Sequence, residues 1–218
     1  MSKTKLVEAK KEELAAPVAA PRLAISAEDI EIPRLNVIQG SSEIDGDEGA
    51  LVINRTHTIM PTGETISVIP ITAAKGWAEN VPFGSNEVAR VAYTADEKQA
   101  IEEDSDFGTI EFADVTLLIP EPAKISEEAV DAFPFPIGDT SYAMGKLHVR
   151  KAAYRNTFKR LGLFQAMNPD APLCAKHWNF QADQATANRV SWYIPQMTVT
   201  KVDTDPQVID FVSRIIPS

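Results

Sequence analysis

Apolar and polar residues alternate over much of the chain, which is the pattern of β-strands that bury one face. This alternation, together with runs of β-branched residues, predicts strands at 30–40, 87–94, 108–120, 174–183 and 189–202. The segment 50–72 predicts a hairpin, because the turn residues 61–63 separate two apolar stretches. Pro195 lies within the last strand and therefore predicts an edge position or a bulge, since proline donates no ladder hydrogen bond.

Helical periodicity is rarer, and it is clearest at 145–164. The apolar residues of that segment fall within about a 60° arc of a helical wheel: Leu147, Tyr154, Phe158 and Leu161. Gly162 marks the expected end of this helix. Short helices are predicted at 126–133, with Ser126 as N-cap, and at 205–216, with Asp205 as N-cap. The charged segment 95–106 fits either a helix or a solvated loop.

Because strands outnumber helices and rarely alternate with them, a doubly wound α/β sheet is disfavoured. The predicted fold class is mainly β with an inserted helix (α+β): a small antiparallel barrel, similar to an oligonucleotide-binding fold with elaborations. Residues 1–24 contain Ala-Pro pairs without a periodic apolar face, which predicts a flexible arm. Residues 25–218 are expected to form a single β-rich domain.

Charge is unevenly distributed over the 218 residues, whose net charge is −10. The first 24 residues carry +2, residues 25–145 carry −17, and residues 146–218 carry +5. This asymmetry predicts one basic surface on an otherwise acidic protein.

No familiar catalytic or metal-binding motif occurs, so we expect neither an enzyme nor a cofactor. The three histidines are far apart in sequence, and the single Cys174 excludes an intramolecular disulfide and a multi-cysteine zinc site. Cys174 and His177 are expected to point to opposite faces of a strand. The acidic segment 41–49 lacks the ligand pattern of a calcium loop and is expected to be a solvated loop.

No apolar run is long enough for a transmembrane helix, and the first residues lack the apolar core of a secretory signal. A cytoplasmic protein is therefore expected.

The segment 146–160 is the strongest chemical signal, because it holds six cations and no acid. Helix surfaces normally mix charges of both signs, since like charges at neighbouring positions repel. Either the acidic remainder of the protein compensates this repulsion, or a bound polyanion does; both readings stay open at this point.

Aromatic residues gather near these cations: eight of the 16 lie in 140–193. Aromatic side chains beside cations suit single-stranded nucleic acids, whose bases stack while their phosphates meet Lys and Arg. Core packing explains most of these aromatics, and one or two are expected to be exposed. The predicted nucleic-acid-binding residues are Lys146, Arg150, Lys151, Arg155, Lys159, Arg160, Lys176, Trp178 and Tyr193.

The chain resembles the single-stranded-DNA-binding proteins that tailed bacteriophages encode. The resemblance rests on the segments 50–72, 112–120, 146–162 and 190–199. It implies an oligonucleotide-binding barrel that coats single-stranded DNA without sequence choice, acting in DNA replication and recombination in the host cytoplasm. It also implies replication or recombination proteins as partners, and a homo-oligomer is a further possibility.

Two other functions fit the same sequence. The flexible arm and many strands suit a structural or assembly protein of a phage particle that binds no nucleic acid. The acidic residues 25–145 also allow a DNA mimic, although these acids are not spaced like phosphates.

Overall fold

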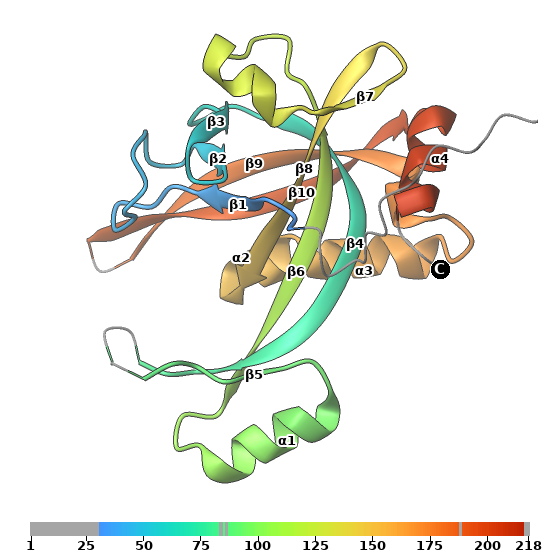
Figure 1. The fold of residues 1–218 in the computed structure, drawn as a ribbon. Coiled ribbons are helices and arrows are strands. Elements are labelled where there is room, and N and C mark those ends of the chain that lie inside the picture. Colours follow the sequence, from blue (N-terminus) through green and yellow to red (C-terminus); the bar gives the residue numbers. More distant parts are fainter. Residues whose placement is uncertain (1–30, 83–84, 86, 188, 216–218) are drawn as a thin grey trace, which may run out of the picture. The chain divides into compact units, whose positions relative to one another are not determined.

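The computed structural model describes residues 31–82, 85, 87–187 and 189–215 (Figure 1). The predicted arm 1–24 lies outside these residues. The described residues from Ile32 onward form one compact unit, and this unit is mainly β, with a curled sheet that makes an open half-barrel. The predicted mainly-β class with few helices is therefore confirmed at this level.

Within the described residues, ten strands form one sheet in the order β10-β9-β4-β6-β8-β1-β2-β3, with β5 beside β4 and β7 beside β8. The strands are β1 Arg34–Val37, β2 Leu51–Ile53, β3 His57–Met60, β4 Ile66–Glu79, β5 Val91–Ala92, β6 Thr109–Pro120, β7 Phe135–Ile137, β8 Thr140–Arg150, β9 Lys176–Ala187 and β10 Val190–Asp203. Neighbouring strands run antiparallel, except that β1 lies parallel to β8.

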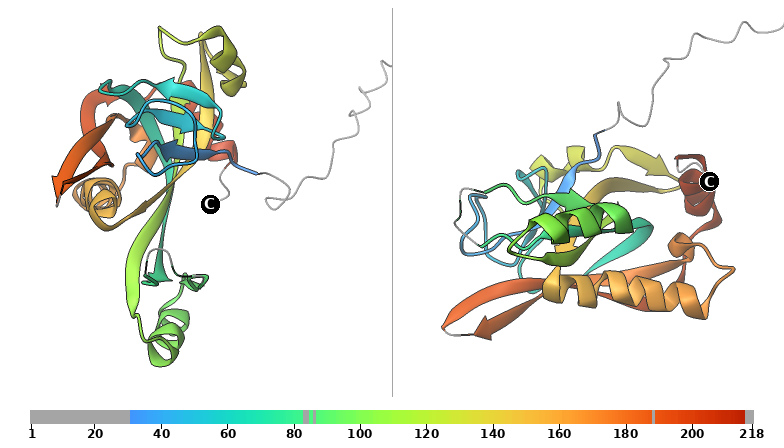
Figure 2. Two further views of the ribbon diagram at one scale, coloured as in Figure 1. Left: turned by 90° about the vertical axis from the view of Figure 1, so that its left-hand side faces the viewer. Right: turned by 90° about the horizontal axis from the view of Figure 1, so that it is seen from below.

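The helices of the described residues are short, at ten residues or fewer each. They are α1 Ala95–Asp104, α2 Lys151–Asn156, α3 Phe158–Met167 and α4 Pro206–Ile215, with 3₁₀ turns at Glu127–Ala132 and Leu173–Ala175. Figure 2 shows that β4 and β6 continue beyond the curled part of the sheet and carry β5 and α1 at their far end.

The main core fills the inner side of the curled sheet. Alternate residues of β6 and β8 point into it, including Val115, Leu117 and Leu147, and all three are buried. The helices α2 and α3 cover this face with Tyr154 and Leu161. A smaller core lies elsewhere in the unit, where α4 contributes Val208 and Val212 and the strands contribute Ile69, Leu118 and Tyr142.

Two close contacts hold β1 in place. Leu35 on β1 lies directly over Gly145 on β8, where any β-carbon would come within 2.6 Å of its side chain. At the far end of the sheet, the Gln39 amide donates to the Tyr193 carbonyl (2.9 Å) and accepts from the Tyr193 backbone N–H (2.8 Å). A side chain thus joins the segment after β1 to the opposite edge strand β10.

The predicted hairpin at 50–72 is wrong. The hairpin is formed by β2 and β3, with a tight turn at Asn54 and Arg55, which both have positive φ (54° and 65°). The next strand, β4, pairs with β6 and β9 instead. Because Val68 and Ile69 are both fully buried although they point to opposite faces, β4 fits an interior position of the sheet.

The predicted helix at 145–164 is also wrong in its first part. Residues 145–150 belong to β8, and helix begins at Lys151, whose φ of 54° makes the sharp strand-to-helix turn. The helix breaks at Thr157 and then continues past the exposed Gly162 to Met167.

Several of the other predicted strands and helices are present in the structure. The strands predicted at 108–120 and 189–202 correspond to β6 and β10, and β10 is an edge strand, as Pro195 predicts. The Asp205 carboxylate caps α4 by accepting from the Gln207 backbone N–H (2.7 Å). The segment 95–106 is helical, and a capping box of Thr94 and Glu97 begins it.

An ion-pair cluster fastens β5 and α1 to the end of β4. The Arg90 guanidinium donates to both oxygens of Glu79 (3.0 and 3.1 Å) and to Asp104 (2.7 Å). The Arg90 contact, followed by a hydrogen bond from Ser105, lowers the pKa of Glu79 to about 2.

Replacing Lys151 with Gly is expected to stabilise the protein by roughly 0.5–1 kcal/mol, because glycine adopts positive φ without the steric cost of a β-carbon. Urea denaturation measures the change. Lys124→Gly, at an exposed position without positive φ, is the control and should give no gain. A loss of stability in Lys151→Gly would contradict the left-handed turn.

Glu79→Gln is expected to lower the melting temperature at pH 7, because it removes the charged partner of Arg90. The pKa of Glu79 is depressed on folding, so its stabilising effect is complete above about pH 4.5 and is lost as pH falls towards about 2. The melting-temperature gap between the two proteins should therefore narrow over that range. Glu64→Gln, at an exposed position, serves as control. Its melting temperature should stay close to that of wild type over the whole pH range.

Candidate nucleic-acid interface

The sequence predicts one helical surface for the six cations of 146–160, but the structure divides them. Lys146 and Arg150 lie on β8 and point away from the core, because the intervening Leu147 and Val149 point into it. Lys151 forms the turn. The other three lie on helices: Arg155 on α2, and Lys159 and Arg160 on α3.

Five of these cations have no ion-pair partner among the described residues, although the charge of Lys159 acts at longer range on Glu111 and helps to lower its pKa. Lys146, Arg150, Lys151, Arg155 and Lys159 are exposed, and no carboxylate of the described residues lies within ion-pair distance of them. Elsewhere, cations commonly have acidic partners: Lys75, Arg90, Lys98, Lys176 and Arg214 each contact one within 3.0 Å. The acidic remainder of the protein therefore forms no ion pairs with these five cations in the described structure.

The helical cations stand beside aromatic rings. Lys159 Nζ lies 5.8 Å from the centre of the Tyr154 ring, and Tyr154 stacks on the half-buried Phe158 (5.1 Å, 24°). Burial raises the pKa of Tyr154, so its hydroxyl stays neutral at physiological pH.

A further cation and ring lie close to this group. Lys75 on β4 lies 4.8 Å from the ring centre of the half-buried Trp77 and pairs with Glu111 at 2.5 Å. This pair lowers the pKa of Glu111 and raises that of Lys75. Sequence reasoning missed both residues, because it ended this strand at residue 72. The signal was there: Lys75 and Trp77 are two apart, as residues on one face of a strand are.

Arg160 and Lys176 are committed to contacts within the protein. The half-buried Arg160 donates to the Met197 carbonyl (2.8 Å) and to Thr198 Oγ1 (3.0 Å), which ties α3 to β10. Lys176 pairs with Asp203 at 2.5 Å. These contacts give both residues a structural role, and their predicted contact with nucleic acid stays a prediction.

Trp178 and Tyr193 are the two predicted stacking residues, and the prediction that Trp178 stacks on a base is wrong. It is 1% exposed, and the edge of its ring packs against Phe164 (5.6 Å, 76°), so no base can reach it. It shares a buried strand face with Phe180, as predicted. Tyr193 is half-buried over Gly49, and its backbone is held by Gln39.

Other candidate chemistry is not assembled. Cys174 is buried in a 3₁₀ turn before β9, and burial raises the pKa of its thiol, which opposes a nucleophilic role. His177 Nδ1 hydrogen-bonds Ser67 Oγ at 2.7 Å. In the described ranges, no three His, Cys, Asp or Glu side chains gather as metal ligands would, the loop 41–49 included. No helix there has the length and apolar character to cross a membrane.

Trp178→Ala is expected to cost about 3–5 kcal/mol of stability, because it leaves a large cavity in the main core. Trp178→Phe should cost clearly less, since the indole Nε1 has no hydrogen-bond partner among the described residues. Chemical denaturation measures both variants. An alanine variant of native stability would show that Trp178 lies outside the core.

Comparison of the chain with protein-family models, with curated proteins and with solved structures gave no match.

Proposed function

We propose that the protein binds single-stranded DNA, without catalysis, through the basic segment that joins β8 to α2 and α3. The observation that carries the proposal is the set of five exposed cations without acidic partners: Lys146, Arg150, Lys151, Arg155 and Lys159. Lys146 and Arg150 lie on the outer face of β8, whereas the other three lie on the turn and the helices that follow it. Of the ten described cations outside 146–160, six have an acidic ion-pair partner.

The cations of this segment are close enough along the chain to repel one another. Cations close together along a chain destabilise the segment that holds them unless counter-charge is supplied. A phosphodiester backbone supplies it, and binding then releases condensed counterions from the nucleic acid. The neighbouring Trp77 and Phe158 are half-buried, so each offers part of a ring to an unstacked base.

On this proposal the open half-barrel is an elaborated barrel of the oligonucleotide-binding type. Its curled, mainly antiparallel sheet is consistent with that architecture, in which single strands lie across strand faces and loops. On this proposal the protein acts in phage-type replication and recombination, in the cytoplasm of the host cell.

Reversing two helical charges tests the interface. The double variant Arg155→Glu, Lys159→Glu should fold normally, because both side chains are exposed. It should weaken binding of a fluorescein-labelled oligothymidine, measured by anisotropy. The slope of log affinity against log salt should also become shallower, by about one for each phosphate that the variant no longer neutralises.

The matched control is Lys124→Glu, Lys201→Glu, which changes the net charge equally at two exposed sites that have no ion pair in the described structure. This control should retain most of the affinity. Equal losses in both double variants would mean that net charge, and not this segment, governs binding. A wild-type protein that binds no oligonucleotide at low salt would refute the proposed function.

A second candidate is the assembly protein, and one observation favours it. The edge strand β10 exposes several apolar residues along its length: Val190, Trp192, Val199 and Val202. An open edge with exposed apolar side chains can pair with another copy of the chain. Sedimentation of the protein alone and with DNA separates the two functions, because large assemblies without DNA affinity would favour the particle subunit.

A further inference from the structure

A row of exposed cations crosses the sheet on the side opposite the main core. In the strand register, Lys146 on β8 lies next to Arg34 on β1, and both are exposed. Arg150 lies on the same face of β8, four residues further on, which is roughly 13 Å along a strand. The outer sides of β1 and β8 therefore present three cations in line.

Two rings border this row. Tyr93, just after β5, is 55% exposed, and its ring meets the buried Phe112 edge-on (5.6 Å, 82°). His148, between Lys146 and Arg150 on β8, lies over the same Phe112 ring (4.9 Å, 35°). Phe112 thus supports both rings from below and leaves their outer sides open.

The Tyr93 backbone is also fixed. Its N–H donates to the Glu97 carboxylate (2.8 Å) at the start of α1. A stacking residue held in this way loses little conformational freedom when a base binds.

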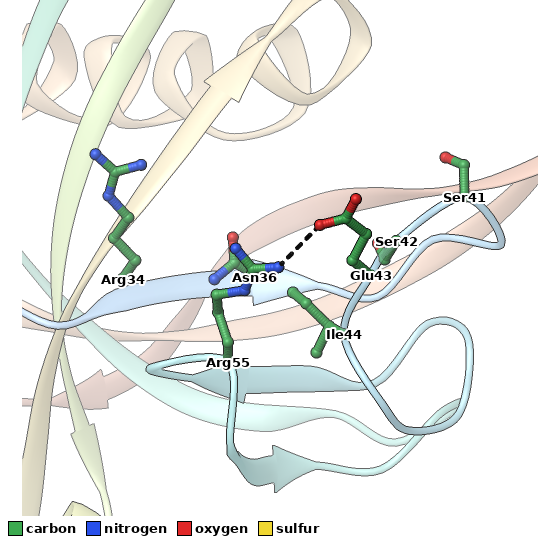
Figure 3. Close-up of a pocket in the computed structure, with 7 residues that line it drawn as sticks. All are labelled: Arg34, Asn36, Ser41, Ser42, Glu43, Ile44 and Arg55. Carbon is green, nitrogen blue, oxygen red and sulfur yellow. Dashed lines mark ion pairs between the residues drawn. The ribbon is translucent and has the colours of Figure 1, made fainter.

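A polar pocket continues the row beyond Arg34. Its volume is about 400 Å³, and Figure 3 shows Arg55 beside Asn36 and directed at Glu43, with Arg34 further along the same strand. Ser41, Ser42 and Ile44 complete the lining, together with Glu43, whose carboxylate lies 3.9 Å from Arg55. Two guanidinium groups with hydroxyl and amide donors suit a phosphate and its sugar.

We propose that this outer face is a second contact surface for single-stranded DNA. Phosphates lie along Arg34, Lys146 and Arg150, a base stacks on Tyr93, and a further phosphate enters the pocket at Arg34 and Arg55. The inference rests on the proposed function, and it extends that interface from Lys146 and Arg150 over the outer face, on the other side of the sheet from the helical cations.

Two acids face the same surface, and their contacts explain why they do not oppose it. Asp114 lies between the rings, where it contacts His148 Nδ1 (2.9 Å) and the Tyr93 hydroxyl (3.4 Å). The Glu43 side chain is 93% exposed and lies 3.9 Å from Arg55, so this is a weak surface ion pair. Asp114 therefore orients the rings, while Glu43 contributes only a weak pair at the rim of the pocket.

Photocrosslinking tests the surface directly. Oligothymidine carrying 5-iodouracil is bound to the full-length protein, irradiated and digested, and the crosslinked peptides are identified by mass spectrometry. Crosslinks at Tyr93 or His148 are expected in addition to any at Trp77 or Phe158. Crosslinks confined to the helical side would overturn the inference and leave the proposed function intact.

Variants give an independent measure. Tyr93→Ala should weaken binding about 5- to 100-fold, as expected for the loss of one stacked base. Tyr93→Phe keeps the ring and removes only the hydroxyl that meets Asp114, so it should weaken binding much less than Tyr93→Ala. Arg34→Gln should weaken binding and lower the salt slope, while the exposed turn residue Arg189→Gln should do neither.

These outcomes separate the two proposals. Unchanged affinity in both Tyr93→Ala and Arg34→Gln, while wild type binds, would refute the outer surface alone. Absence of binding by wild type would refute the proposed function and this inference with it. Circular dichroism shows whether each variant keeps its fold. Arg34→Gln removes no buried side chain, so it still tests the surface if Tyr93→Ala unfolds.

Discussion

The insertion of β8 between β6 and β1 is the constraint on which the rest of the structure depends. Its register sends Leu147 and Val149 into the core and turns Lys146 and Arg150 outward. A slip of one residue would bury the cations and expose the core residues, at a cost that the fold could not recover. One strand thus determines both the packing of the core and the position of the charge.

The same strand explains the main failure of sequence reasoning. The residues 145–150 alternate strictly between apolar and polar, which is strand periodicity, but the run of cations and apolar residues continues into a true helix from Lys151 onwards. Leu147, Tyr154 and Leu161 satisfy a helical arc and are all buried, yet Leu147 reaches the core from a strand. Burial was predictable from the pattern, whereas the change of element depended on one residue adopting positive φ.

The cations of the candidate site could be predicted from the sequence, whereas its exposed aromatic rings could not. The absence of acids from 146–160 is plain in the sequence, and exposure of five of its cations follows from their polarity. Which rings are exposed depends on contacts between distant segments: Phe164 covers Trp178, whereas Tyr93 stands open over Phe112. Arg34 joins Lys146 through a parallel pairing, for which the sequence carries no local signal.

That parallel pairing has a consequence for how the chain folds. Arg34 and Leu35 meet partners more than a hundred residues later, so the contact closes a very long loop. During synthesis, the hairpin of β2 and β3 precedes β8 and cannot yet join the sheet through β1. Its residues Leu51 and Ile53 belong to the main core and lack their partners on β8 until residues 140–150 have been synthesised. Long-range pairing of this kind slows folding in general, and apolar residues that wait for their partners are open to aggregation or to chaperones.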